Sequence, residues 1–246
     1  MDFGLLSEIA PQKLSTFKKN FLTFDIDWAS DEVLEYCLDI IEEAAIKATW
    51  FVTHQTPLLE RLRANPLFEL GIHPNFNLLL EGDFTYGRNY CEVLKYFLDI
   101  VPEAKVIRSH CLGVSSKILY QAKQLGITHE SNTLVPAMAL DTSAGGGYYI
   151  PYNNWDGLVC CPYHWADDVA CMYENKVNLN LLGAENNYFV ISFHPIHLFL
   201  NTESLSRYQQ AKSFYKDYKR LKEYRGNSPY GSLEILKNLL KRNVNG

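Results

Sequence analysis

The chain has no strong excess of one charge, no long apolar run and no signal-like N-terminus, and each absence excludes a class of protein. Its formal net charge of -5 provides no basic field that would gather nucleic acid. No segment approaches the roughly 18 consecutive apolar residues of a membrane-spanning helix. Asp2 and Glu8 stand where a secretory signal carries positive charge. We therefore expect a cytoplasmic protein with no transmembrane segment and no nucleic-acid partner.

The six cysteines form no CxxC pair and lack the close spacing of a small disulfide scaffold. Cysteine is commonly a small core residue, so reduced and mostly buried thiols are expected. The adjacent Cys160 and Cys161 are a candidate redox switch, but neighbouring residues of a strand point to opposite faces. Core packing is therefore the favoured interpretation of this pair.

What the sequence does contain is an alternation of short apolar runs with longer segments of helical period. This alternation is typical of βα units around a parallel sheet. With 246 residues, 47% of them hydrophobic, and no Pro/Ser-rich linker or internal repeat, the chain predicts one α/β domain over residues 1–246. Strands are expected at 21–26, 48–53, 68–72, 105–109, 127–130, 158–161 and 188–193, and helices at 30–45, 56–64, 90–101, 115–125, 203–224 and 232–242.

Two stretches of the chain need separate interpretation. Residues 135–154 hold three consecutive glycines and show neither period, which predicts a long loop at the rim of the sheet. In residues 207–225 basic side chains alternate with aromatic ones. That spacing favours an amphipathic helix with a solvated basic face over a phosphate or lipid contact. The basic side chains concerned are Lys212, Lys216, Lys219, Arg220 and Lys222.

Ionisable side chains follow several of the expected strands at their carboxyl ends, where parallel barrels build their active sites. A single histidine or aspartate at such a place is more often a hydrogen-bonded structural residue or a helix cap than a ligand. Their convergence on one rim reverses that preference and favours a site that holds a metal and manages a proton. The residues are Asp25, Asp27, His54, His73, Arg108, His110, His194 and His197.

The motifs around these residues resemble, in order, the successive motifs of the polysaccharide deacetylase superfamily. TFDID, ELGIHPNFN, RSH and ISFHP follow one another between about Phe21 and His197. The likeness is greatest to the WbmS-type branch, which is found with bacterial surface-polysaccharide genes. It implies a distorted parallel (β/α) barrel and a metal-dependent hydrolase that removes an N-acetyl group from an amino sugar in O-antigen or capsule biosynthesis. Together with the expected location, it suggests a lipid- or nucleotide-linked sugar substrate.

The resemblance also implies roles for the paired acids and their partners. Asp25 matches the general base and Asp27 a metal ligand, although Ile26 separates them where the family's acids are adjacent, so the two roles remain exchangeable. Arg108 matches the arginine that holds the catalytic aspartate. His194 matches the general acid that protonates the leaving amine, a task suited to an imidazole.

The implied metal shell departs from the family at one position. The family has two ligand histidines one helical turn apart, and here His73 is followed four residues later by Asn77. A neutral amide oxygen is a poorer zinc ligand than an imidazole. Asn75, His54 and His110 are therefore alternatives for the missing ligand. The implied cofactor is a divalent metal, with zinc as the first expectation.

The substrate pocket is the least specific part of the resemblance. The segment PYHWADD loosely matches the fourth motif, so that Trp165 would wall the acyl pocket and Asp168 would orient a neighbouring side chain. His54 and His110 complete the predicted substrate-binding set.

Two rival functions remain open. The first is a metal-independent hydrolase, or one acting on other amides, which the missing histidine favours. The second is a non-catalytic carbohydrate-binding relative. Retention of Asp25, Arg108 and His194 argues against it, because a binding module needs no base and acid together.

Overall fold

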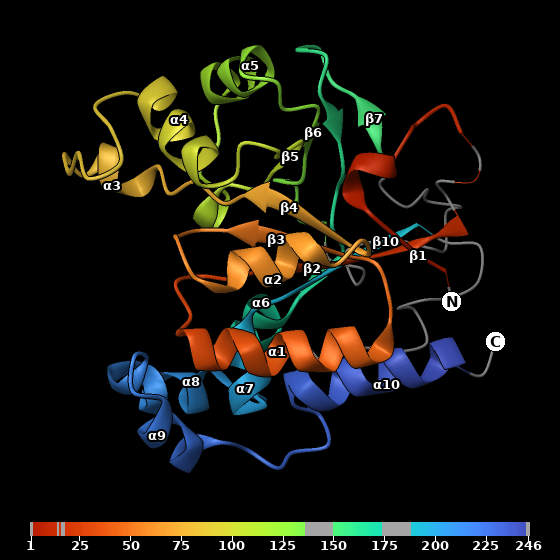
Figure 1. Ribbon diagram of the computed structural model, residues 1–246, viewed down its shortest axis with the longest axis vertical. Coiled ribbons are helices and arrows are strands. Elements are labelled where there is room, and N and C mark those ends of the chain that lie inside the picture. Colours follow the sequence, from red (N-terminus) through yellow and green to blue (C-terminus); the bar gives the residue numbers. More distant parts are fainter. Residues whose placement is uncertain (1, 14, 16–17, 136–149, 174–187, 245–246) are drawn as a thin grey trace.

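The computed structural model describes residues 2–13, 15, 18–135, 150–173 and 188–244 (Figure 1). The predicted loop at 135–154 lies mostly outside these residues. The strands are β1 (Phe3–Gly4), β2 (Asn20–Asp25), β3 (Ala48–Val52), β4 (Phe68–Ile72), β5 (Val106–Ile107), β6 (His129–Glu130), β7 (Tyr152–Asn153), β8 (Val159–Cys160), β9 (Trp165–Ala166) and β10 (Phe189–Phe193). Of the strands in the described residues, the expectation missed β1, β7 and β9, each of which has two residues.

The strands form a curled sheet in the order β7-β8-β6-β5-β4-β3-β2-β10-β9, with β1 beside β2. Every pair is parallel except the antiparallel pair of β7 and β8. Strand β8 pairs with β6, and β9, a few residues later, pairs with β10. A bridge between Leu134 and Tyr163 lies between these two pairings. Residues 159–166 thus run from one side of the curled sheet to the other, and the predicted distorted parallel barrel is confirmed.

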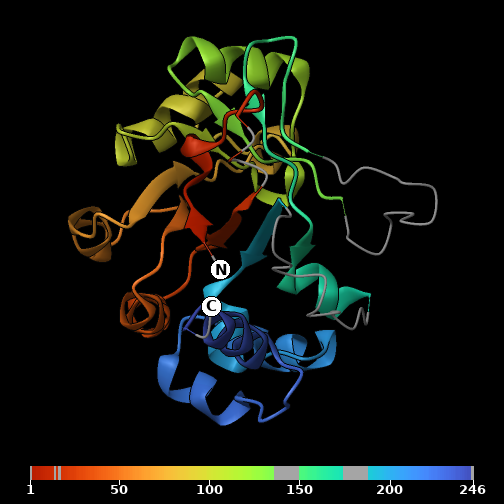
Figure 2. The same ribbon diagram turned by 90° about the vertical axis from the view of Figure 1, so that its right-hand side faces the viewer.

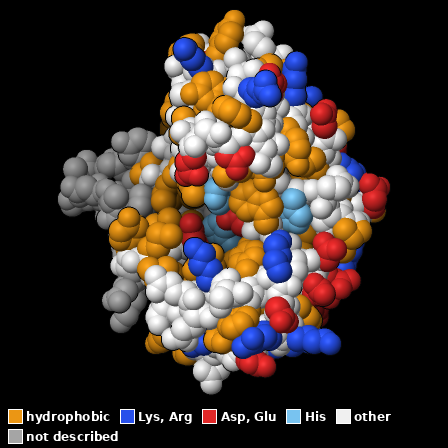
Figure 3. All heavy atoms as spheres, turned by 90° about the vertical axis from the view of Figure 1, so that its left-hand side faces the viewer, with side chains coloured by type: hydrophobic (Ala, Val, Ile, Leu, Met, Phe, Trp, Pro, Cys, Tyr) orange, Lys and Arg blue, Asp and Glu red, His pale blue; other side chains and the backbone are white. Residues whose placement is uncertain are grey.

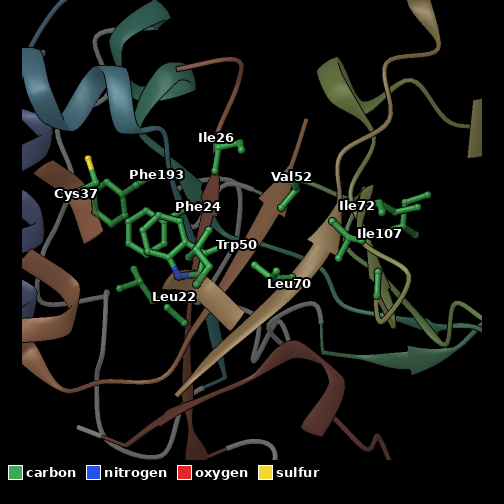
Figure 4. Packing of buried hydrophobic residues seen from close by; sticks show 14 of the residues in the cluster. Leu22, Phe24, Ile26, Cys37, Trp50, Val52, Leu70, Ile72, Ile107 and Phe193 are labelled. Carbon is green, nitrogen blue, oxygen red and sulfur yellow. The ribbon is translucent and has the colours of Figure 1, made fainter. Parts of the chain in front are cut away.

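Alternate residues of the central strands face two different cores, as the two-residue period of a strand requires. Phe21 and Phe51 belong to a buried cluster inside the barrel. Leu22, Phe24 and Trp50 belong to the cluster under the helices, where the rings of Phe24 and Trp50 stack at 4.2 Å (Figure 4). A polar residue in step with the first set therefore points into the barrel.

The helices α1 (Asp31–Ala44), α2 (Leu58–Ala64), α4 (Tyr90–Ile100), α5 (Ser116–Gln124) and α10 (Ser232–Val244) lie where they were expected. The single helix expected at 203–224 is wrong. The chain forms α8 (Leu205–Ala211), η5 (Lys212–Phe214), α9 (Tyr218–Leu221) and η6 (Lys222–Tyr224) instead. Asp217 caps α9 by accepting a hydrogen bond from the Arg220 amide, which starts a new helix inside the amphipathic pattern. Five short helical elements of the described residues were not foreseen: η1 (Leu6–Glu8), α3 (Asn77–Leu80), η3 (His110–Leu112), α6 (Asp167–Met172) and α7 (Pro195–Leu200).

The two ends of the barrel differ. Strands β3 and β4 point their carboxyl ends to the left in Figure 1, and both chain termini lie on the opposite face, which Figure 2 turns to the viewer. Near the termini, the Leu6 amide donates to Thr49 Oγ1 and the Ser7 amide to the Glu69 carboxylate, so η1 covers this end. The carboxyl end is left for a site. No helix of the described residues is long and apolar enough to cross a membrane.

Candidate active site

A pocket of about 250 Å³ opens at the carboxyl ends of the strands. Figure 3 looks onto this face and shows histidine and acidic side chains at the bottom of a hollow. The side chains come from the carboxyl ends of β2, β4, β5 and β10 and from the start of α6. Those that carry ionisable groups are Asp25, Asp27, His73, Arg108, His110, Asp168 and His194.

Arg108 lies at the centre of a buried polar network below the pocket. It is 1% exposed, and its Nη1 donates to Asp25 Oδ1 at 2.9 Å, to Thr23 Oγ1 at 2.9 Å and to Ser192 Oγ at 2.8 Å. Nε and Nη2 donate to the carbonyl and hydroxyl oxygens of Ser131. The guanidinium charge compensates the buried Asp25 carboxylate and fixes its orientation.

Asp27, His73 and His110 form a second group, whose ligand atoms all lie within 4.8 Å of one another. Asp27 Oδ1 is 3.3 Å from His73 Nε2 and 3.4 Å from His110 Nδ1. This buried oxygen has no well-directed hydrogen bond within the described part of the chain. One carboxylate oxygen and two imidazole nitrogens suit zinc. The donor set therefore fits a divalent metal ion.

The pKa shifts of Asp27 and His110 are those expected for a site that attracts a cation. Burial alone would raise the pKa of Asp27, but the imidazoles of His110 and His73 and the charge of His194 hold it well below its ordinary value. Burial opposes protonation of His110, yet Asp27 raises the pKa of His110 to about 10. The carboxylate thus attracts positive charge into the pocket. A bound metal ion would take the place of the imidazole protons.

The backbone that carries Asp27 is strained. Asp27 and Trp28 have left-handed φ values of 39° and 54°, which are uncommon outside glycine. The Tyr215 hydroxyl donates to the Asp27 carbonyl, the Lys216 ammonium donates to the Trp28 carbonyl, and the Trp28 amide donates to Thr53 Oγ1 at 3.0 Å. The segment after α8 therefore helps to hold the turn that brings Asp27 next to His73.

His194 faces both aspartates across the pocket. Its Nε2 lies 3.8 Å from Asp25 Oδ2 and 3.7 Å from Asp27 Oδ2. Its Nδ1 lies 2.7 Å from Asp167 Oδ1, and its amide donates to Asp167 Oδ2 at 3.0 Å. Burial opposes protonation of His194, but the carboxylates of Asp168 and Asp167 outweigh it and raise the pKa of His194 well above its usual value. The imidazole is held so that its Nε2 proton points into the pocket.

The predicted metal ligand Asn77 does not take the place that the sequence suggested. Asn77 does not share a helix turn with His73, because residues 73–76 are not helical and α3 begins only at Asn77. Pro74 disfavours helical geometry at His73. In the described residues the second imidazole beside His73 comes from His110. His110 was predicted from the sequence as a member of the substrate-binding set and also as one of the alternatives for the missing ligand. The Asn75 side chain accepts a hydrogen bond from the Asn77 amide at 3.0 Å.

Trp165 does not wall the pocket. Its strand partner in register is Ile191, which belongs to the outer core, and its ring packs edge-on against Phe193 at 5.1 Å. Tyr163, two residues earlier, lines the pocket instead, with its ring 4.4 Å from the Arg108 guanidinium carbon. His54 contacts Thr53 Oγ1 at 2.9 Å and is not among the described residues that line the pocket.

The predictions for Asp168 and His197 also need correction. Asp168 lines the pocket, but the hydrogen bond that orients a neighbour comes from Asp167, which the sequence had not singled out. The sequence shows the two adjacent acids, but it does not show which of them contacts His194. The start of α6 at Asp167 places that residue, rather than Asp168, next to His194. His197, expected at the rim, is buried behind His194, with their ring centroids 5.7 Å apart.

A barrel that gathers an arginine-held carboxylate, a carboxylate-held imidazole and a metal-type ligand set at one end has the groups that a metal-assisted hydrolase needs. The family model described as WbmS-like polysaccharide deacetylase matches residues 22–212. The chain belongs to this family, whose members hydrolyse the amide bonds of acetylated sugars. The predicted family and enzyme class are confirmed.

Two solved structures are reported as similar to this chain, and the first of them supports the assignment. A Bordetella bronchiseptica protein, assigned as a polysaccharide deacetylase involved in O-antigen biosynthesis, shares 39% identity with this chain, with 98% of each chain covered and a TM-score of 0.88. A protein from Mycobacterium smegmatis, assigned as a polysaccharide deacetylase, shares 15% identity over 91% of this chain and 90% of its own, with a TM-score of 0.47. No curated protein matches the sequence.

Proposed function

We propose that this protein removes the N-acetyl group from an amino sugar during synthesis of a bacterial surface polysaccharide, with a divalent metal, preferably zinc, held by Asp27, His73 and His110. The observation that carries the proposal is the division of labour between the two aspartates: Arg108 holds Asp25, whereas Asp27 lies between two imidazoles. The full-length similarity to a protein assigned to O-antigen biosynthesis supports the biological setting. A lipid- or nucleotide-linked sugar is the proposed form of the substrate.

The side chains divide the reaction between them. When bound, a divalent ion supplies a Lewis acid for the acetamide carbonyl and makes water more acidic. Asp25 accepts the proton of the attacking water as the carbonyl carbon becomes tetrahedral. His194 donates its Nε2 proton to the nitrogen, the C–N bond breaks, and acetate and the free amine leave. Asp167 stabilises the charged imidazole until this transfer.

The position of the His110 imidazole argues against the alternative of a metal-independent hydrolase. Its placement beside Asp27 and His73 restores the second histidine whose absence at position 77 favoured that rival. The direct test is acetate release from N-acetylated sugars by the zinc-loaded protein and by the same protein after chelation. Equal rates in the two samples would refute metal dependence.

The ligand assignment predicts that His110→Ala weakens zinc binding by more than the roughly 10–100-fold that loss of a supporting residue costs. The reason is that an imidazole nitrogen itself is removed from the shell. Calorimetric zinc titration of the apo-protein measures the effect, with Asn77→Ala as the matched control. If Asn77→Ala weakens binding and His110→Ala does not, the shell follows the original expectation for Asn77.

The orientation of His194 predicts that Asp167→Asn lowers kcat by about a hundredfold, because an amide stabilises the imidazolium less and can hold the opposite tautomer. Substrate binding, followed through KM, should change little. Asp168→Asn is the comparison variant: its carboxylate also favours the charged His194 imidazole, but its hydrogen bond goes to the Val169 amide at 2.7 Å, so a smaller loss of kcat is expected. A greater loss in Asp168→Asn would restore the role first predicted for Asp168.

A further inference from the structure

A second cavity of about 460 Å³ continues from the catalytic pocket toward the segment after α8. The two cavities share Asp27, His110 and His194, so a ligand reaching the catalytic groups can extend into the second. In Figure 3 basic side chains lie along one edge of the hollow that holds the histidines. The second cavity is lined by Lys212 and Lys216.

These two lysines are set apart from other cations of the basic stretch 207–225. Arg207 is paired with Glu203, Arg220 stacks on Phe214, and Arg225 stacks on Tyr36. Lys222 lies over the Tyr218 ring. Lys212 and Lys216 form no ion pair with the described residues, and both line the cavity; Lys216 also lies 5.7 Å from the centroid of the Tyr215 ring. The predicted solvated basic face thus holds two cations directed toward the site.

The position of Lys216 is fixed by the catalytic turn. Its ammonium donates to the Trp28 carbonyl, one residue after Asp27. One hydrogen bond leaves donors of the ammonium available, since lysine has three. The acids in the same cavity are Asp27, which lies between its two imidazoles, and Asp168.

The rest of the cavity wall suits a sugar. Tyr208 and Tyr215 line it together with the apolar side chains of Ile196 and Leu205. The Tyr208 ring packs on His197 at 4.9 Å, and the Tyr215 hydroxyl is bound to the Asp27 carbonyl, so both rings have a defined place. Aromatic rings with an apolar body and a polar tip can cover a sugar face while the cations meet a charged group.

We propose that Lys212 and Lys216 bind an anionic group, a phosphate or a carboxylate, carried by the substrate next to the acetylated sugar. The acidic net charge of the chain gives no general attraction for anions, so the selectivity has to come from these two side chains. This inference rests on the proposed function, because it places the acetamide in the first pocket. It narrows the substrate class to acetylated sugars with a phosphate link or a uronic acid unit.

Three probes test the proposal: N-acetylglucosamine, N-acetylglucosamine 1-phosphate and N-acetylglucosaminuronic acid. Their affinities are measured by calorimetry on the zinc-loaded protein carrying Asp25→Asn, which is expected to slow turnover during titration. We expect one anionic sugar to bind about tenfold to a hundredfold more tightly than the neutral one, as for hydrogen bonds to charged groups. Preference for the 1-phosphate indicates a nucleotide or lipid link, and preference for the uronate indicates an acidic sugar unit.

The lysine variants locate the effect. Lys212→Met and the double variant Lys212→Met/Lys216→Met should lose most of the ratio between anionic and neutral affinities. Lys219→Met, an exposed member of the same basic stretch that does not line the cavity, should keep it. Equal affinities for all three sugars, no measurable binding of either anionic sugar, or an unchanged ratio in the double variant would each overturn the proposal.

Acetate release by the protein with Asp25 intact separates this inference from the proposed function. Equal rates with neutral and anionic sugars would refute the anion site while supporting the hydrolase. No release from any sugar, together with lysine-dependent anion binding, would refute the hydrolase while leaving the anion site supported.

Discussion

Asp25→Asn is expected to lower the rate of acetate release by about a hundredfold to ten-thousandfold, the range for a positioned general base. The amide that replaces the carboxylate cannot accept the proton of the attacking water. Its oxygen can still accept the hydrogen bond that Arg108 Nη1 now gives to Asp25 Oδ1 at 2.9 Å, so the fold should persist. Zinc affinity should change little, because the metal-type ligand set does not include Asp25.

The same substitution at Asp27 supplies the control. Asp27→Asn replaces the anionic ligand between His73 and His110 by a neutral amide, and zinc binding should fall with activity. Zinc titration and acetate release on both variants measure the two effects separately. If Asp25→Asn loses zinc and Asp27→Asn retains it, the base and the ligand have exchanged roles.

Most strands and the rim that carries the site could be predicted because each functional residue follows a buried strand. The alternation in β2, with Phe21 and Thr23 facing inward, places Asp25 inside the barrel by period alone. The same argument places His194 after Ser192. Residues fixed by strand period were therefore accessible from the sequence.

The metal-ligand positions that were misassigned lie in turns, where no period applies. The role of Asn77 rested on a helical turn that Pro74 and the extended chain after β4 do not provide. His110 reaches Asp27 because the chain reverses just after it, with Cys111 and Leu112 at left-handed φ values of 52° and 55°. Such a reversal by residues other than glycine has no sequence signal.

The segment at 203–224 shows a different limit of prediction from sequence, the position of helix ends. Its amphipathic spacing was real, but spacing does not reveal where a helix stops and restarts. The break between Phe214 and Tyr218 lets Tyr215 and Lys216 reach back to the turn after β2, a contact between residues 188 positions apart. A contact so distant in sequence is decided by packing rather than by local propensity.

Arg108→Met is expected to lower the free energy of unfolding by about 3–5 kcal/mol, the usual result of removing one partner of a buried ion pair. Methionine fills part of the space between Phe51 and Tyr163 but donates no hydrogen bond. Asp25 would be left as a buried carboxylate without its cation. Activity should fall together with stability, because the Asp25 carboxylate loses the side chain that holds its orientation. Denaturant unfolding and acetate release by the folded fraction measure the two effects.

Arg63→Met is the matched control, because Arg63 forms ion pairs with Glu60 and Glu103 while 30% of its side chain is exposed. It should cost about 1 kcal/mol or less. The double variant Arg108→Met/Asp25→Asn then tests the cause. If the loss comes from an uncompensated charge, neutralising Asp25 should recover about 0.5–3 kcal/mol relative to the sum of the single variants. Additive losses would instead attribute the effect of Arg108 to its contacts with Thr23, Ser131 and Ser192.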